Sequence, residues 1–233
     1  MVDLTQEMAA LWASLGPSRP DRGRVIQFIS ATSGEGTSTV AREYARLAAV
    51  RARKPVWLVD ADLNNQTQQS LVARETDRFG ALGRPALASP NGSAFFTIQP
   101  ALRGRDGRLI ADARLLSARP CLGRRLWVTQ FRSDVLKAGQ RAVALPRGAY
   151  WDAMRRHAET VIVDSPSADR TDFGLTIAPF ADAVVLVVAA EASDASLGAD
   201  LRDELENAGA RCAGLVFNRA RAQPPSFLKR VMG

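Results

Sequence analysis

The fold is decided by residues 25–39, which read VIQFISATSGEGTST. Val25–Ile29 is a short apolar run of the kind that forms a buried strand. A turn containing Gly34 and Gly36 follows, and a helical pattern begins near Ser38 and continues to about residue 52. A strand, a glycine-rich turn and a helix N-terminus in this order place backbone N–H groups and the positive end of the helix dipole around an anion. The stretch therefore predicts a phosphate-binding turn.

This turn resembles a P-loop but differs at the lysine. In the pattern G-x-x-x-x-G-K-[ST], the lysine reaches the β/γ-phosphates and the final hydroxyl coordinates Mg²⁺. Ser38 occupies the hydroxyl position here, whereas Thr37 stands where the lysine is expected. A glycine turn before a helix also occurs in proteins with no ligand at that place, so the turn alone leaves both interpretations open. The candidate phosphate-binding residues are Gly34, Glu35, Gly36, Thr37, Ser38 and Thr39.

Two further strands end in carboxylates. Val56–Val59 is followed by Asp60 and Asp62, and Val161–Val163 is followed by Asp164. In open α/β sheets, ligands bind outside the carboxyl ends of the strands, where these acids are expected to lie. An aspartate at a strand end can also cap the next element. Three acids beside a phosphate turn favour a nucleotide site with a metal ion over capping alone.

The remaining pattern predicts an α/β protein with one insertion. Helical spacing covers residues 4–15 and about 148–158 and 196–208, and further strands are expected at 160–163, 183–188 and 212–217. This alternation predicts a mostly parallel, doubly wound sheet of the P-loop NTPase type with a small β insertion. Residues 1–22 are expected to form a helix and linker, and residues 23–233 a P-loop-like α/β domain.

The insertion is basic and spans about residues 75–147. Strand-like segments at Phe95–Ile98 and Leu126–Phe131, with a turn at Gly104–Gly107, predict a hairpin-like arrangement over 94–132. Residues 101–147 carry eleven Lys or Arg against three acids, in a chain of net charge +7. Such a surplus is typical of a patch for an anionic partner, but also of a solvated arginine-rich surface. Because no nucleic-acid motif accompanies it, DNA is disfavoured as the partner.

Several classes of protein are disfavoured by composition. The longest apolar run, Ala183–Ala190, is far shorter than a bilayer span. The N-terminus lacks the basic start and apolar core of a signal peptide. Cys121 and Cys212 form no CxxC pair, and His157 is the single histidine, which argues against a disulfide framework, a zinc site or a Ser-His-Asp triad. The expected location is the cytoplasm, with peripheral attachment to the inner membrane face left open.

Four motifs in a fixed order resemble a known family. They are SATSGEGTSTVA (30–41), VWLVDADLNNQ (56–66), TVIVDSPSADRTDFGLTIAPFADAVVLVVAA (160–190) and GLVFNR (214–219). Together they resemble the bacterial tyrosine-kinase and capsular-exopolysaccharide family of P-loop proteins, part of the group that includes the partition and septum-site ATPases. The resemblance covers about residues 24–74 and 148–220.

The resemblance implies roles for the strand-end residues. By motif position, Asp60 acts on the attacking hydroxyl, while Ser38, Asp62 and Asp164 surround Mg²⁺. Asn218 corresponds to the asparagine that contacts adenine in the family. The implied ligands are ATP or ADP with Mg²⁺.

The chain departs from the family pattern at three places. Thr37 replaces the lysine, so a full charge is missing where transition-state charge develops. The tyrosines are Tyr44 and Tyr150, and a C-terminal tyrosine cluster is lacking. Counting from Glu7, Ala10 and Ala13 fill the arginine positions of the family's ring-forming E-x-x-R-x-x-R motif.

These departures predict a kinase-like protein of exopolysaccharide or capsule biosynthesis and export that is catalytically weak or inactive (a pseudokinase). Its expected partner is a membrane polysaccharide co-polymerase or chain-length protein, and a homo-oligomer is also open. One alternative is an active Mg-ATPase or tyrosine kinase, in which Arg170 or a residue of a second subunit supplies the missing charge. A further alternative is a partition-type DNA-associated ATPase.

Overall fold

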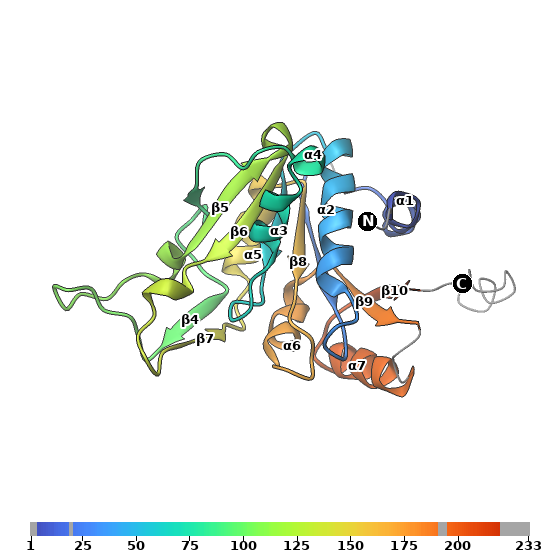
Figure 1. The fold of residues 1–233 in the computed structure, drawn as a ribbon. Helices are drawn as coiled ribbons and strands as arrows, with labels where there is room; N and C mark the ends of the chain where they lie inside the picture. Colours follow the sequence, from blue (N-terminus) through green and yellow to red (C-terminus); the bar gives the residue numbers. More distant parts are fainter. Residues whose placement is uncertain (1–3, 19–20, 191–194, 220–233) are drawn as a thin grey trace, which may run out of the picture.

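The structure is a computed structural model that describes residues 4–18, 21–190 and 195–219 (Figure 1). Its main sheet has eight strands in the order β10-β9-β1-β8-β2-β6-β5-β3, and β4 and β7 form a separate two-stranded sheet. The strands are β1 (Arg24–Ile29), β2 (Val56–Asp60), β3 (Ala86–Leu87), β4 (Phe96–Gln99), β5 (Leu116–Cys121), β6 (Leu126–Phe131), β7 (Arg141–Ala144), β8 (Thr160–Asp164), β9 (Ala183–Ala189) and β10 (Cys212–Asn218).

The helices lie between these strands along the chain. They are α1 (Thr5–Leu15), α2 (Thr37–Arg51), α3 (Gln68–Arg74), α4 (Thr76–Phe79), α5 (Ala149–His157), α6 (Phe173–Ile177) and α7 (Ala195–Asn207), with short 3₁₀ turns at Asp112–Leu115, Leu122–Arg124, Ser133–Val135 and Ala178–Phe180. The predicted helices near 4–15, 38–52, 148–158 and 196–208 are confirmed to within about a residue at most ends. The short helices α3, α4 and α6 had no clear sequence pattern, because four to seven residues are too few to show a helical period.

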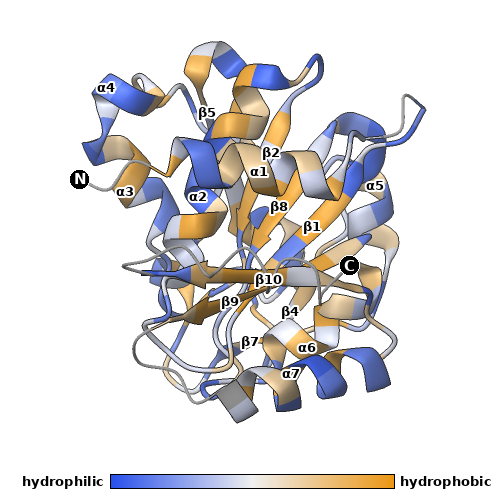
Figure 2. Cartoon of the chain, turned by 90° about the vertical axis from the view of Figure 1, so that its right-hand side faces the viewer, coloured by the Kyte–Doolittle hydropathy of each residue, from blue (hydrophilic) through white to orange (hydrophobic). Residues whose placement is uncertain are grey.

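The sheet is mostly parallel and covered on both faces, as predicted. The strands from β10 to β6 run parallel, whereas β5 and β3 are antiparallel additions at one edge. Every residue of β2 and β8 is buried, which is typical of parallel strands between two helical layers. Figure 2 shows these apolar strands lying between the helices. One apolar core packs α1 and α2 against one face, and two others pack α5, α6 and α7 against the opposite face.

Strand register brings the predicted site residues to one edge of the sheet. Asp60 at the end of β2 pairs in register with Asp164 at the end of β8. Phe28 of β1, two residues before the P-loop begins at Ser30, pairs with the same Asp164. The three carboxyl ends therefore meet side by side.

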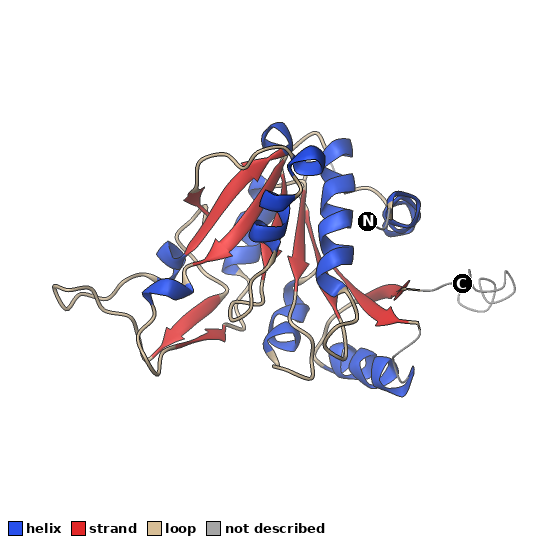
Figure 3. Ribbon diagram, in the orientation of Figure 1, coloured by secondary structure: helices blue, strands red, loops and turns tan. Residues whose placement is uncertain are grey.

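The predicted hairpin over 94–132 is wrong. Strand β4 pairs with β7, with Phe96 opposite Ala144, and not with β6 (Figure 3). Strand β6 lies instead in the main sheet, parallel to β2, where the rings of Trp57 and Trp127 stack 5.3 Å apart. The predicted turn is present, since Gly107 N–H donates to the Gly104 carbonyl at 3.0 Å. The small β insertion is thus the β4–β7 pair.

Both tyrosines belong to the cores. Tyr44 of α2 and Tyr150 of α5 are each 0% exposed. Tyr150 packs against Phe95 and Trp151, with ring centroids 5.0 Å apart in each pair, while the Tyr44 hydroxyl accepts a hydrogen bond from Arg24 at 3.3 Å. Neither phenol reaches solvent in the folded protein.

Among the helices described, none has the length and apolar character needed to cross a bilayer. Residues 220–233, which the predicted α/β domain includes, lie outside the described part of the chain.

Candidate functional site

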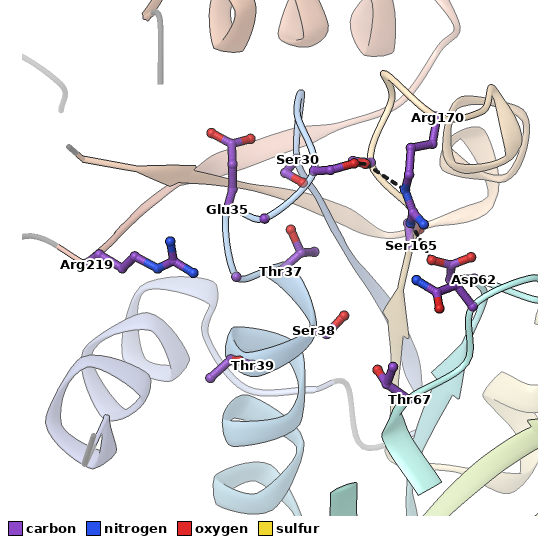
Figure 4. Close-up of a pocket in the computed structure, with 15 residues that line it drawn as sticks. Ser30, Glu35, Thr37, Ser38, Thr39, Asp62, Thr67, Ser165, Arg170 and Arg219 are labelled. Carbon is purple, nitrogen blue, oxygen red and sulfur yellow. Dashed lines mark hydrogen bonds and ion pairs between the residues drawn. The ribbon is translucent and has the colours of Figure 1, made fainter. Parts of the chain in front are cut away.

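A cavity of about 490 Å³ opens where β1, β2 and β8 end (Figure 4). The P-loop forms one side of it, and the loops after β2 and β8 form the other. Its lining residues are Ser30, Ser33, Gly34, Glu35, Gly36, Thr37, Ser38, Thr39, Asp62, Asn65, Thr67, Ser165, Ser167, Arg170 and Arg219. All six predicted phosphate-binding residues lie here.

The P-loop backbone has the conformation of an anion cradle. Gly34 and Gly36 have φ angles of 86° and 91°, a left-handed conformation that favours glycine. Gly36 is also the N-cap of α2, a helix of 15 residues. In the described structure the N–H groups of Thr37 and Ser38, in its first turn, donate no hydrogen bond. With the helix dipole, these donors fit a phosphate group.

The loop is held in this shape by three polar side chains. The buried Glu35 carboxylate accepts the N–H groups of Thr32 at 3.1 Å and Ala189 at 3.3 Å. The Asn218 amide donates to the Glu35 carbonyl at 2.8 Å, and Asp169 accepts the Ser33 N–H at 3.0 Å. Glu35 and Asn218 thus support the loop, and the adenine contact of Asn218 stays a prediction. Asp169 was not identified from the sequence, because no sequence pattern indicates that a carboxylate in the loop after β8 will accept a hydrogen bond from the P-loop.

The left-handed backbone conformation and a close contact with Asn218 both favour glycine at residue 36. A Cβ atom added at Gly36 would lie 2.0 Å from the Asn218 Nδ2 atom, well inside van der Waals contact. The same residue has a positive φ, which disfavours any other side chain.

Thr37 is the position where the cradle lacks a cation. The residue lines the cavity and is 6% exposed, and its Oγ1 atom has no hydrogen-bond partner among the described residues. A hydroxyl can donate a hydrogen bond to a phosphate oxygen, but it adds no charge. The loop itself therefore provides hydrogen bonds and a helix dipole without the positive side chain of a P-loop.

Asp164 lies beneath the P-loop in a polar contact with Gln68 and Ser38. One of its oxygens accepts the Gln68 Nε2 group at 2.6 Å, and the same amide donates to the Ser38 carbonyl at 2.8 Å. The other oxygen, Oδ1, is buried and has no hydrogen bond of normal geometry with any described residue. Burial raises the pKa of Asp164 to about 6, against the opposing effects of Gln68 and the Ser38 hydroxyl. Gln68 was not predicted, since a glutamine in a short helix carries no motif.

Asp60 supports the next loop and does not line the cavity. It is 1% exposed, and its carboxylate accepts the N–H groups of Asp62 at 3.3 Å and of Thr67 and Gln68 at 3.0 Å each. Burial, and then the nearby charge of Asp164, raise the pKa of Asp60 well above its usual value, while the Gln68 and Thr67 N–H groups oppose the rise. The carboxylate thereby caps the N-terminus of α3. Its predicted role as a base stays a prediction.

Asp62 lies at the cavity and forms an ion pair with Arg170 across it. The Arg170 Nε group also donates to the Ser167 hydroxyl at 3.1 Å. The Asp62 carboxylate is close enough to Asp164 to raise the pKa of Asp164. The charge of Asp62 is, however, already paired with the Arg170 guanidinium.

The oxygen donors present fit Mg²⁺ in part. Mg²⁺ prefers oxygen ligands such as carboxylates and hydroxyls, and Ser38 and the unpartnered Asp164 oxygen provide two close together. Within the described ranges, no group of three or more His, Cys, Asp or Glu side chains is arranged as a metal site. Asp62, the third predicted ligand, can join only if it leaves Arg170.

The raised pKa of Asp164 predicts a stability that falls as pH rises. The Asp164 carboxyl has a pKa of about 6 in the folded state and 3.8 in the unfolded state. Its contribution to the free energy of unfolding is therefore full below about pH 4 and is lost as the pH rises through 6. Over this pH interval the wild type should lose about 3 kcal/mol of unfolding free energy through this group, and we expect Asp164→Asn to lack that loss. Urea denaturation in EDTA measures the difference.

Asp169→Asn is the matched control, because the pKa of that exposed carboxyl is lowered, not raised. A difference in unfolding free energy between wild type and Asp164→Asn that stays constant from pH 4 to 7 would contradict the assignment.

Comparisons with known proteins identify the fold. No family model matches the chain, and no curated protein matches it. Among solved structures, the chain is similar to the VpsO kinase domain, at 18% identity and a TM-score of 0.54 over 85% of this chain and 86% of that one. The kinase domain of the Escherichia coli tyrosine kinase ETK matches at 15% identity and 0.54, over 95% and 74% of the two chains. The septum site-determining protein MinD of Pyrococcus horikoshii, solved with Mg-ADP, matches at 18% and 0.54, over 90% and 77%. The chain therefore has the fold common to bacterial tyrosine-kinase domains and MinD-type ATPases.

Proposed function

We propose that this chain is a cytoplasmic, tyrosine-kinase-like component of exopolysaccharide or capsule biosynthesis and export that docks to a membrane chain-length protein and has lost most of its kinase activity. The observation that carries the proposal is Thr37. It stands uncharged in a phosphate cradle whose glycines, helix N-terminus and supporting side chains are otherwise in place.

The missing charge supports weak or absent phosphoryl transfer. The lysine of a P-loop stabilises charge on the transferring phosphoryl group. A hydrogen bond to a charged group is worth about 1.5–3 kcal/mol, and each 1.36 kcal/mol of barrier is about a tenfold change in rate. The loss of the lysine therefore lowers the expected rate by at least tens of fold.

The burial of both tyrosines supports a protein that does not phosphorylate itself on tyrosine. Tyr44 and Tyr150 are fully buried in separate cores, so neither hydroxyl is accessible to a second molecule without unfolding. Phosphorylation would also place roughly two negative charges in an apolar environment.

The cavity supports nucleotide binding as the retained property. The N–H groups of Thr37 and Ser38 would hold a phosphate, Ser38 and Asp164 would hold Mg²⁺, and Asn218 would lie beside the base. Bound Mg²⁺ would neutralise phosphate charge. The chain's own contribution is to fix the loop through Glu35, which keeps the donors aligned without a ligand.

The basic insertion supports an anionic partner. Five basic residues within 101–147 are exposed, and among the described residues none of their side chains forms an ion pair with an acid: Arg105, Arg114, Lys137, Arg141 and Arg147. Unpaired surface charge of one sign is available to an acidic segment of a partner or to the inner leaflet.

Genetic deletion combined with partner capture tests the proposal. We expect the tagged protein to co-purify with a membrane chain-length protein from its source organism, and deletion to reduce the amount or length of the polysaccharide. Complementation by the Tyr44→Phe/Tyr150→Phe double variant should restore both, because neither phenol accepts phosphate. Normal polysaccharide in the deletion strain, together with no membrane partner, would refute the proposal.

A working ATPase is a second candidate, because of one observation. Arg170 lies in the cavity, where it can supply a positive charge. ATP turnover that Ser38→Ala abolishes would support this candidate.

A further inference from the structure

The cavity contains positive side chains from outside the P-loop. Among its described lining residues, Arg170 and Arg219 are cationic. Arg219 follows the loop-supporting Asn218, whereas Arg170 belongs to the loop after β8, on the opposite side of the cavity. In Figure 4 the Arg170 guanidinium lies between Ser165 and Asp62, above Ser38. Arg170 is therefore the cation on the same side as the predicted metal ligands.

Two contacts hold Arg170 in this position. One Nη atom pairs with the Asp62 carboxylate, and Nε donates to the Ser167 hydroxyl at 3.1 Å. The Ser167 hydroxyl in turn lies 3.0 Å from the Ser33 hydroxyl of the P-loop. The guanidinium is thus linked through one serine to the loop that would hold a phosphate.

Arg170 retains capacity for a further anion. A guanidinium has five N–H donors in a planar fork that suits two oxygens of a phosphate. Its contacts with Asp62 and Ser167 use Nη2 and Nε, and Nη1 donates no hydrogen bond to any described residue. The side chain is 38% exposed, so the donors can be reached from the cavity.

The ion pair with Asp62 is one that a phosphate can displace. The pair is partly exposed, with 38% of the Arg170 side chain and 17% of the Asp62 side chain open to solvent, so water screens it in part. A phosphate group carries more charge than a carboxylate and can accept two N–H groups of the guanidinium fork, whereas Asp62 accepts one. Exchange of Asp62 for a phosphate therefore replaces one contact of the guanidinium with a more highly charged one, and it also frees the carboxylate that the predicted Mg²⁺ site needs.

We propose that Arg170 is the phosphate-contacting cation of this site, replacing from the β8 loop the charge that Thr37 does not supply, and that Asp62 holds it until a nucleoside di- or triphosphate arrives. The proposal rests on the proposed function, because it assumes that the P-loop still binds phosphate. It assigns Arg170 to binding of the phosphate chain and makes no claim about turnover.

Calorimetric titration with ADP, and with inorganic pyrophosphate as a probe without a base, tests this role. In EDTA, we expect Arg170→Gln to weaken the binding of ADP and the binding of pyrophosphate by about tenfold to a hundredfold each, which is the effect of losing a charged hydrogen bond. Arg170→Lys should recover part of the loss, because it restores charge without the fork. Arg156→Gln is the matched control, since Arg156 is exposed at the end of α5 and does not line the cavity.

The Asp62→Asn variant distinguishes competition with phosphate from a purely structural role of the ion pair, because the two predict different changes in ADP affinity. If Asp62 competes with phosphate for Arg170, removing its charge should strengthen ADP binding in EDTA. If the ion pair only stabilises the loop, the same variant should weaken binding or leave it unchanged. Thermal unfolding without nucleotide verifies that each variant is folded.

The outcomes separate this proposal from the proposed function. Binding of ADP by wild type that neither Arg170→Gln nor Asp62→Asn alters would overturn the role of Arg170 and leave phosphate binding by the loop intact. No binding of ADP or pyrophosphate by wild type would also overturn it, while docking to the membrane partner would stand or fail separately in the deletion strain.

Discussion

Replacing Thr37 with lysine is expected to raise the affinity for Mg·ADP and Mg·ATP by about tenfold to a hundredfold. The new ammonium group would lie in a cradle whose backbone donors are already aligned, so its hydrogen bonds to the phosphates should be worth about 1.5–3 kcal/mol. Because a ligand stabilises the native state by mass action, the gain is measured as a larger thermal shift at the same nucleotide concentration. Thr76→Lys, which adds the same charge at the exposed start of α4, is the control.

The two cations are expected to be coupled. If Arg170 substitutes for the lysine, then Arg170→Gln should cost less in the Thr37→Lys background than in the wild type. Sites that share one ligand group depart from additivity in this way. A nucleotide shift in Thr37→Lys no larger than in wild type and Thr76→Lys would mean that the loop no longer presents its donors to a phosphate.

Asp60→Ala is expected to lower the free energy of unfolding by about 3 kcal/mol. The carboxylate accepts three backbone N–H groups, of Asp62, Thr67 and Gln68. A buried donor left without a partner costs about 1–3 kcal/mol, and the cost of burying the Asp60 charge offsets part of the sum. Denaturation in urea near neutral pH measures the change.

Asp60→Asn and Asp77→Ala complete this experiment. Asparagine keeps one acceptor oxygen and should lose less stability than alanine, while Asp77 is exposed in α4 and should change it by less than about 0.5 kcal/mol. If Asp60→Ala were as stable as Asp77→Ala, the carboxylate would not be the cap of α3. Loss of activity in an Asp60 variant then has to be separated from loss of structure.

The local parts of the site could be predicted from the sequence, because they depend on short-range patterns. The order of strand, glycine turn and helix gave the P-loop, and apolar runs ending in aspartate located the neighbouring strands. Asp60 and Asp164 were expected at the same edge of the sheet, and the structure shows that β2 and β8 are neighbours with the two residues in register.

The sequence could not separate the roles of the three aspartates. Asp60, Asp62 and Asp164 all follow apolar strands, yet they differ in what surrounds them. Asp60 faces backbone donors, Asp164 faces an amide, and Asp62 faces a guanidinium. Gln68 comes from a segment with no motif of its own. Arg170 lies within a motif and was named as one possible source of charge, but only the tertiary structure pairs it with Asp62.

The wrong hairpin has a related cause. Alternation shows that a segment is a strand but does not give its partner. Strand β4 pairs with β7, more than forty residues along the chain, and β6 joins β2 through two stacked tryptophans. Long-range pairing of this kind depends on side-chain packing that no local pattern encodes.

The attachment of Glu35 to the end of β9 has a consequence for the thermodynamics of ligand binding. Many phosphate-binding loops become ordered only around their ligand, so part of the affinity is used to restrict the backbone. In this chain Glu35, Asn218 and Asp169 restrict it during folding. The conformational entropy of the loop is therefore already lost before a phosphate arrives, and a cradle weakened by the absence of its lysine keeps more of its remaining hydrogen-bond energy as affinity.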